Sequence, residues 1–164
     1  FIISVNFVGS DFCSDLAFFT SRRRYDQYRD ELMTNLLVIS SNLTNDVVDP
    51  FAIVDYYNLA CDESGLYDNS MIMLLRLLSF IEIRDVTVAG FDGFDKSKPN
   101  YAYEKHYKDN KHTEDENCTI SNYIEKFSSK MRIHFLTKTK YAFSQDYHIQ
   151  LPLLPYKFCG SVRE

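Results

Sequence analysis

The sequence predicts a three-layer, Rossmann-like α/β domain with a mostly parallel sheet, and three observations support this prediction. Patterns typical of strands and of helices alternate along the chain, as they do in folds built on parallel strands. Several strand-length runs are continuously apolar, which is typical of strands buried on both faces. The chain has 164 residues, of which 45% are hydrophobic, so we expect one domain spanning residues 1–164.

The first part of the chain predicts three strands and one helix. Residues 2–8 alternate β-branched with small or polar side chains, and residues 15–20 form a second short apolar run. Ser21 is a residue type that caps helices, and the helix is expected over 24–33. Residues 36–40 form a nearly continuous apolar run of strand length, which favours a buried parallel strand.

The middle of the chain contains the strongest helix signal. A strand is expected over 51–57, and the helix follows over 64–83, where the pattern is apolar nearly all round. Asp62 or Ser64 is the expected cap of this helix. Residues 85–91 then predict a strand that runs into a glycine-containing turn.

The last part predicts one more helix and one more strand. Residues 95–116 are rich in polar side chains and tyrosine, and they are expected to form a long loop or a partly helical lid. A helix is expected over 117–131 and a strand over 132–137. Residues 141–164 show no clear period.

Composition excludes several functional classes. The net charge of −5 and the isoelectric point near 5.4 argue against a partner that is nucleic acid. No apolar run reaches the roughly 20 residues of a membrane span. No pair of the four cysteines has the spacing of a zinc or redox site. We therefore expect the cysteines to be free thiols and the protein to be cytoplasmic, where disulfides are rare. The chain opens on Phe1 inside an apolar run, which predicts a fragment of a longer protein or a processed chain.

Candidate ligand-binding residues follow from one rule of parallel sheets, in which ligands bind at the carboxyl ends of the strands. Asn6, Thr20 and Asp92 lie at or just after such ends, and Ser64 and Gly65 precede the long helix. Each has a purely structural alternative: Asn6 ties loops together, Ser64 caps the helix, and Asp92 caps a turn. The functional interpretation requires these residues to share one edge of one sheet.

Other residues in the sequence carry weaker signals. His106 or His112 is a candidate general base, because histidine titrates near neutral pH. Tyr103 belongs to a tyrosine-rich segment that either stacks on a ligand or simply covers the core. The basic run at 22–24 either holds phosphate groups or is a solvated surface. We expect no resident cofactor and no metal.

Several of these segments together resemble a known family. The segments that resemble the C-terminal domain of bacterial aldolase-like proteins are Ile3-Ser4-Val5-Asn6-Phe7, Asp15-Leu16-Ala17-Phe18-Phe19-Thr20, Arg24-Tyr25, Ser64-Gly65 and Val88-Ala89-Gly90-Phe91-Asp92-Gly93-Phe94. In those proteins a TIM barrel resembling HMG-CoA lyase comes first, and they are often called 4-hydroxy-2-oxovalerate aldolases. More distantly, the segments resemble the Rossmann-like bacterial lipooligosaccharide sialyltransferases.

The resemblance implies roles for individual residues. Asn6, Thr20 and Ser64-Gly65 match positions that hold the nucleotide of a CMP-sugar, and Asp92 matches an acidic residue of a glycine-containing segment. A barrel aldolase needs about 250 residues, so any lyase activity would belong to an upstream TIM-barrel domain.

Three functional hypotheses follow for the chain. The first is an accessory domain of an aldolase-like protein, with a cleft for a nucleotide or sugar-nucleotide and no aldolase site of its own. The second is a sialyltransferase-like glycosyltransferase that uses a CMP-sugar, with His112 or His106 as its base. The third is a non-catalytic interaction module. Whether this chain is itself an enzyme, and in which oligomeric state it exists, is left open by the sequence.

Overall fold

A computed structural model describes residues 1–9, 13–32, 36–45, 47–61, 68–95 and 113–141. The described residues fall into two compact units: unit 1 contains residues 1–58 and unit 2 contains residues 59–141. Each unit holds its own set of parallel strands.

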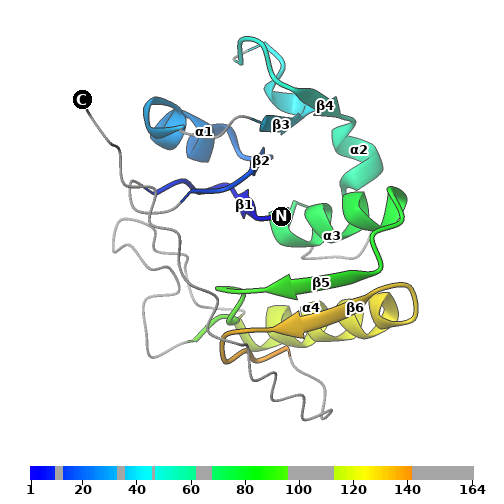
Figure 1. Cartoon of the computed structure of the whole chain (residues 1–164). Coiled ribbons are helices and arrows are strands. Elements are labelled where there is room, and N and C mark those ends of the chain that lie inside the picture. The colour runs from blue at the N-terminus through cyan, green and yellow to red at the C-terminus, as the bar shows by residue number, and fades with distance from the viewer. Residues whose placement is uncertain (10–12, 33–35, 46, 62–67, 96–112, 142–164) are drawn as a thin grey trace, which may run out of the picture. The chain divides into compact units, whose positions relative to one another are not determined.

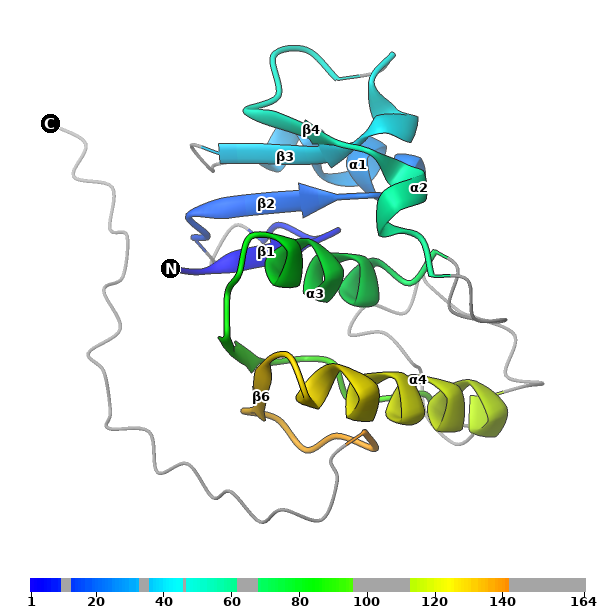
Figure 2. The same cartoon turned by 90° about the vertical axis from the view of Figure 1, so that its right-hand side faces the viewer.

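Unit 1 is built on a four-stranded parallel sheet in which the strands lie side by side in chain order (Figure 2). Every pairing within it is parallel. The strands are β1 (Ile3–Val5), β2 (Leu16–Phe19), β3 (Leu36–Ser40) and β4 (Ala52–Val54). The strands therefore end at one common edge, where the chain leaves each strand into a loop.

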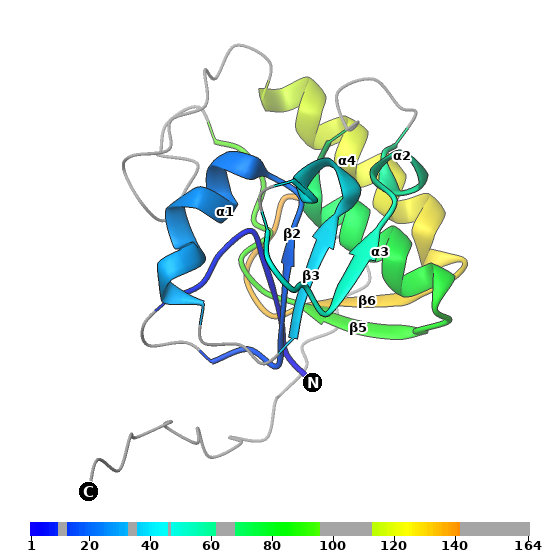
Figure 3. The same ribbon diagram turned by 90° about the horizontal axis from the view of Figure 1, so that it is seen from above.

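One face of this sheet packs against helix α1 (Arg22–Tyr28), which runs alongside β2 and β3 (Figure 3). Tyr25 and Tyr28 point from the helix into a buried apolar cluster, and the ring of Tyr25 meets that of Phe19 edge to face. The remaining members come from the strands and loops of the same unit: Val8, Ala17, Ile39, Leu43 and Val47. Burying an aromatic or branched side chain contributes about 2 kcal/mol, so this face holds the unit together.

The helix in unit 1 begins where its cap predicts and ends earlier than expected. The Ser21 hydroxyl accepts a hydrogen bond from the N–H of Arg24, so the predicted cap is confirmed and the helix starts at Arg22. After Tyr28 the chain tightens into a 3-10 turn, η1 (Arg29–Glu31), instead of continuing to residue 33. A second 3-10 turn, η2 (Ser41–Leu43), follows β3.

Unit 2 pairs two parallel strands, β5 (Asp85–Val88) and β6 (Arg132–Phe135), which lie side by side in Figure 1. Helix α4 (Thr113–Ser128) lies between them in sequence, so β5, α4 and β6 form a βαβ arrangement. Helix α3 (Ser70–Phe80) precedes β5. A short helix, α2 (Tyr56–Leu59), spans the boundary between the units in sequence.

The expected start of the long helix is wrong. Helix α3 begins at Ser70, and its cap is Asn69, whose side-chain oxygen accepts a hydrogen bond from the N–H of Ile72 at 3.2 Å. Asparagine satisfies a free N–H of the first turn as well as serine does, so the cap is not at 62 or 64. The end of the helix at Phe80 is close to the expected end at residue 83.

The strand expected over 51–57 is also shorter than predicted. Strand β4 ends at Val54, and the carboxylate of Asp55 then accepts a hydrogen bond from the N–H of Asn58 at 2.8 Å. That bond turns the chain into α2, because an aspartate at this point offers the backbone a helical alternative to the ladder. Helix α4 begins at Thr113, four residues before its expected start, and its first turn carries three acidic residues.

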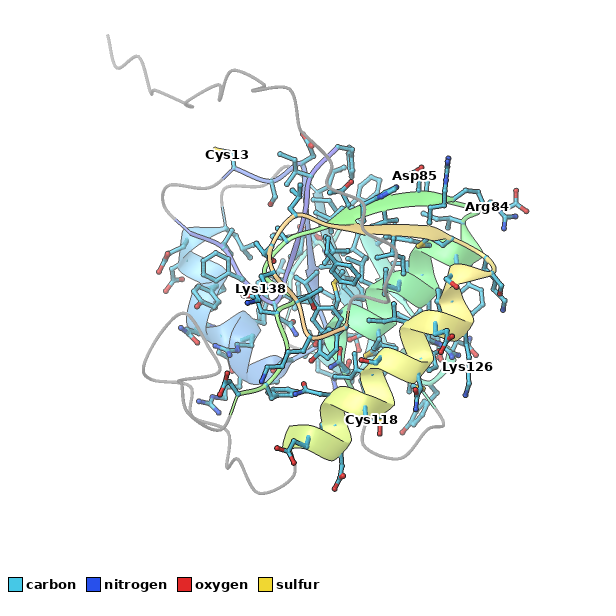
Figure 4. All side chains as sticks on the ribbon, turned by 90° about the horizontal axis from the view of Figure 1, so that it is seen from below. Cys13, Arg84, Asp85, Cys118, Lys126 and Lys138 are labelled. Atoms are coloured by element: carbon cyan, nitrogen blue, oxygen red, sulfur yellow. The ribbon has the colours of Figure 1, made fainter. Side chains whose placement is uncertain are left out.

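The predicted fold class is confirmed, since helices alternate with strands and all the strand pairings described are parallel. No helix in the described part of the chain is long and apolar enough to cross a membrane. Three cysteines lie within the described ranges, and none of Cys13, Cys61 and Cys118 forms a disulfide. Cys13 and Cys118 are exposed (Figure 4), whereas Cys61 is buried.

Candidate functional site

Asn6 occupies the first loop at the carboxyl edge of the unit 1 sheet. Its backbone has a φ of 50°, in the left-handed region that asparagine tolerates better than most residues. Its side-chain oxygen accepts hydrogen bonds from the N–H groups of Thr20 at 2.9 Å and Ser21 at 3.3 Å. Its amide nitrogen donates to the Thr20 hydroxyl at 3.3 Å. One side chain therefore joins the end of β1 to the end of β2.

Asn42 makes the corresponding connection between β3 and β2. Its amide nitrogen donates to the carbonyl oxygen of Thr20 at 3.0 Å, and its side-chain oxygen accepts from the buried hydroxyl of Ser40. The same Ser40 hydroxyl lies 3.4 Å from the carbonyl oxygen of Phe19. Thr20 is thus held from both sides, by Asn6 and by Asn42, and the ends of three neighbouring strands are joined. We call Asn6, Thr20, Ser21, Ser40 and Asn42 the strand-end network.

Cationic side chains adjoin the strand-end network directly. Arg22, Arg23 and Arg24 follow Ser21, and the first two are exposed. Arg22 pairs with Asp26 at 3.0 Å on the helix surface, and Arg24 donates to the side chain of Gln27 at 3.3 Å. The result is a surface of amide and hydroxyl groups beside guanidinium groups, which suits a hydroxylated anion.

Asp92 belongs to unit 2, in the loop that follows β5. Its carboxylate accepts a hydrogen bond from the hydroxyl of Thr137 at 2.6 Å, and that hydroxyl accepts from the N–H of Gly90 at 3.0 Å. The carbonyl oxygen of Asp92 accepts from the N–H of Lys140 at 2.9 Å. The exposed Asp92 side chain is therefore fixed by the segment that leaves β6.

The same loop is fixed a second time by Asn117 on α4. The side-chain oxygen of Asn117 accepts from the N–H of Phe94 at 2.8 Å, and its amide nitrogen donates to the Phe94 carbonyl at 2.8 Å. Gly93 has a φ of 92°, and a Cβ there would lie 2.9 Å from Cβ of Lys140 and 3.2 Å from Oδ1 of Asn117. Only glycine fits this position.

The predicted site residues divide into three groups. Asn6 and Thr20 are brought together by two hydrogen bonds in unit 1. Asp92 is held in unit 2, and its convergence with Asn6 stays a prediction. The others lie outside the described residues, so their roles also stay predictions: Ser64, Gly65, Tyr103, His106 and His112.

Sequence reasoning missed Asn42, Asn117 and Thr137. Asn42 carries a usable signal, because it lies two residues after a strand that was predicted as a buried parallel one. Asn117 carries none, because it is 23 residues from Phe94. Its sequence context, Asn117-Cys118-Thr119, matches a glycosylation pattern instead, yet its amide is already used in a hydrogen bond.

Two further polar clusters occur in unit 2. Asp85 at the amino end of β5 (Figure 4) pairs with Arg132 at 2.8 Å and lies 3.3 Å from His134. Between the helices, Arg76 of α3 donates to the hydroxyl of Tyr123 of α4 at 2.9 Å. Burial raises the pKa of Tyr123, and the neighbouring Arg76 opposes that shift. No cluster of potential metal ligands occurs within the described ranges.

Comparison of the chain with family models, with curated proteins and with solved structures yields no match.

Proposed function

We propose that the carboxyl edge of the unit 1 sheet binds a nucleotide or sugar-nucleotide, in an accessory domain of an aldolase-like protein that has no aldolase site of its own. The observation that carries this proposal is the strand-end network, in which Asn6 joins β1 to β2. A parallel sheet binds ligands at this edge. The resemblance described above places nucleotide-holding residues at Asn6 and Thr20.

The chemistry of the edge suits binding more than catalysis. Its groups are amides, hydroxyls and guanidinium groups, and residues 1–58 contain no histidine. Arginine is matched to phosphate, because its planar fork forms two parallel hydrogen bonds. The exposed Arg22 and Arg23 therefore supply the phosphate contacts in this proposal, and the amides near Asn6 and Asn42 face the sugar or the base.

Thermal-shift measurements with CMP, UDP and a CMP-sugar at millimolar concentration test the proposal. A ligand present at 100 times its Kd stabilises the folded state by about 2.7 kcal/mol, which is readily detected. We expect a rise in Tm with at least one of these ligands. No rise with any of them contradicts the proposal.

The informative variant is Asn6→Asp. Aspartate keeps the oxygen that accepts from Thr20 and Ser21, and it also tolerates the left-handed backbone. It places a negative charge where the anion would lie, so we expect the nucleotide-induced rise in Tm to disappear. Asn45→Asp, in an exposed loop of the same unit, is the matched control for the charge and should retain the rise. A rise that survives Asn6→Asp excludes this edge as the site.

A non-catalytic interaction module is the second candidate, and one observation favours it. Both polar atoms of the Asn6 side chain are engaged by Thr20 and Ser21, as they would be if Asn6 only tied loops together. In that case no nucleotide raises the Tm of the unmodified chain or of the Asn6→Asp and Asn45→Asp variants. The strand-end network then has a purely structural role.

A further inference from the structure

The outer strand of the unit 1 sheet is only partly covered. Phe51 donates its N–H to the carbonyl oxygen of Leu37 at 2.8 Å, and Ile53 is the register partner of Ile39. Phe51 and Ile53 therefore lie on the sheet face that packs against α1. Ile39 belongs to the buried cluster there, whereas Phe51 is 66% and Ile53 is 53% exposed. The apolar face thus extends beyond its helical cover.

The surroundings of β4 add to this exposed apolar surface. Val48 before the strand is 85% exposed, and Tyr57 after it is 76% exposed. No charged residue occurs from Phe51 to Val54. In the described part of the chain β4 pairs with β3 alone, so its outer edge presents unpaired backbone groups. Exposed apolar edge strands of this kind are normally blunted by charge, because they recruit another strand.

We propose that β4 pairs with β4 of a second copy of this chain, antiparallel and about a two-fold axis near Ala52. An antiparallel pairing centred on Ala52 sets Phe51 opposite Ile53 of the second copy, and Ile53 opposite its Phe51. Residues that face one another across antiparallel strands lie on the same side of the sheet. Both aromatic–aliphatic pairs then fall on the α1 side, and the two small Ala52 side chains meet on the other.

Area and the self-complementary register favour a second copy, and charge argues against an anionic occupant. The four exposed apolar side chains of residues 48–57 would bury on the order of 1,000 Å² over two copies if fully covered, which reaches the lower limit of a specific interface. Asp49 and Asp55 flank the strand, so an anionic surface such as a lipid headgroup layer or a nucleic acid is disfavoured. The same two aspartates approach each other across the two-fold axis, so salt should strengthen the dimer by screening them.

Sedimentation equilibrium of the whole chain tests the association. We expect a monomer–dimer equilibrium that tightens when NaCl is raised. Ile53→Lys, at an exposed position, should raise the dimer Kd by at least roughly tenfold. Ile81→Lys, at an equally exposed apolar position in unit 2, is the matched control and should leave the Kd unchanged. A chain that is monomeric throughout, or a dimer unaffected by Ile53→Lys, overturns the proposal.

Disulfide trapping tests the register. In a chain with Cys13, Cys118 and Cys159 changed to serine, Ala52→Cys should form an intermolecular disulfide under mild oxidation, because directly opposed residues have Cα atoms about 4.5–5.5 Å apart. Asn45→Cys in the same background is exposed and away from the edge, so it should remain unlinked. Equal cross-linking of both variants, or a dimer in which Ala52→Cys does not link, contradicts the pairing. This proposal does not depend on the ligand proposed above.

Discussion

The loops after the two parallel sheets are fixed by different means. In unit 1 the ends of neighbouring strands are joined to each other by short polar side chains, Asn6 and Asn42, that sit in the loops themselves. In unit 2 the loop after β5 is held from outside, by Asn117 on α4 and by the segment that follows β6. The first arrangement leaves the strand ends as a continuous polar surface, and the second builds one rigid loop around Asp92.

This difference affects how much each glycine and asparagine contributes to stability. A loop held from outside must fit closely against its supports, so its glycines are sterically required. A network of strand ends depends on individual hydrogen bonds, each of which contributes about 1 kcal/mol. The largest effects of substitution are therefore expected in unit 2.

Gly93→Ala should be the most damaging single substitution. The new Cβ would lie 2.9 Å from Cβ of Lys140, and the backbone φ is 92°, so we expect a loss of about 3 kcal/mol in the free energy of unfolding. Gly90→Ala is the matched control: its φ is 73° but no atom lies within 4 Å of the added Cβ, and a loss of about 1 kcal/mol is expected. Chemical denaturation measures both, and equal losses would refute the steric fit.

Asn117→Ala should come next, at about 2 kcal/mol, because the N–H of Phe94 loses its side-chain acceptor and the Phe94 carbonyl loses one donor while keeping Nζ of Lys140 at 2.8 Å. Asn117→Asp keeps the acceptor for the Phe94 N–H and loses the donor to its carbonyl, so it should be less damaging. Urea denaturation ranks the two variants. If alanine is tolerated as well as aspartate, the loop after β5 is not held by Asn117.

Asn6→Gly should cost about 1.5 kcal/mol, since glycine suits the left-handed backbone and only the side-chain hydrogen bonds to Thr20 and Ser21 are lost. Asn6→Ala should cost more, because alanine adds backbone strain to the same loss. The difference in unfolding free energy between the two variants measures that strain. A glycine variant as stable as the unmodified chain would mean that Asn6 does not join β1 to β2.

Tyr123→Phe should cost about 1 kcal/mol at neutral pH, where it removes the hydrogen bond from Arg76. The pKa of Tyr123 is raised by burial, so the folded state holds the phenolic proton more tightly than the unfolded chain does. That contribution to stability is complete below the ordinary tyrosine pKa of about 10 and is lost as pH rises through the higher value in the folded state. Denaturation midpoints above pH 10 should therefore fall more steeply for the unmodified chain than for Tyr123→Phe. Parallel curves would contradict the raised pKa.

Asp85→Asn should have the smallest effect, below about 0.5 kcal/mol, because its ion pair with Arg132 lies at a solvent-exposed strand end. In thermal denaturation, the difference in Tm between the variant and the unmodified chain should be small at low salt and smaller still at high salt, because salt screens the pair. A loss as large as that of Asn6→Gly would show that this end of the unit 2 sheet matters more than its exposure suggests.

The fold was predictable because its information is local. The apolar run at 36–40 is reproduced residue for residue as β3, and Ser21 marks the start of α1 as its chemistry requires. The element boundaries that were predicted wrongly have equally local causes. Asn69 caps α3 in place of residue 62 or 64, and Asp55 ends β4 earlier than expected. Capping residues of several types compete within a few positions, so a pattern alone does not choose among them.

Of the candidate site, the residues at the edge of the unit 1 sheet could be predicted from the sequence, and the partners of Asp92 could not. Asn6 and Thr20 follow from the rule that parallel strands end at one edge, and Asn42 would have followed from the same rule applied to β3. The partners of Asp92 could not be inferred, because Thr137 lies 45 residues away in sequence and no local pattern links the two. Long-range hydrogen bonds of this kind depend on the completed tertiary structure.

The most direct test of the proposed function is to map the amide resonances of the isotopically labelled chain by NMR during titration with CMP. We predict saturable shifts concentrated at Thr20, Ser21, Arg22 and Asn42, the amides at the carboxyl edge of the unit 1 sheet. We also predict that Asn6→Asp abolishes these shifts while Asn45→Asp preserves them. Shifts that are absent, or that cluster elsewhere in the chain, would contradict a nucleotide site at this edge.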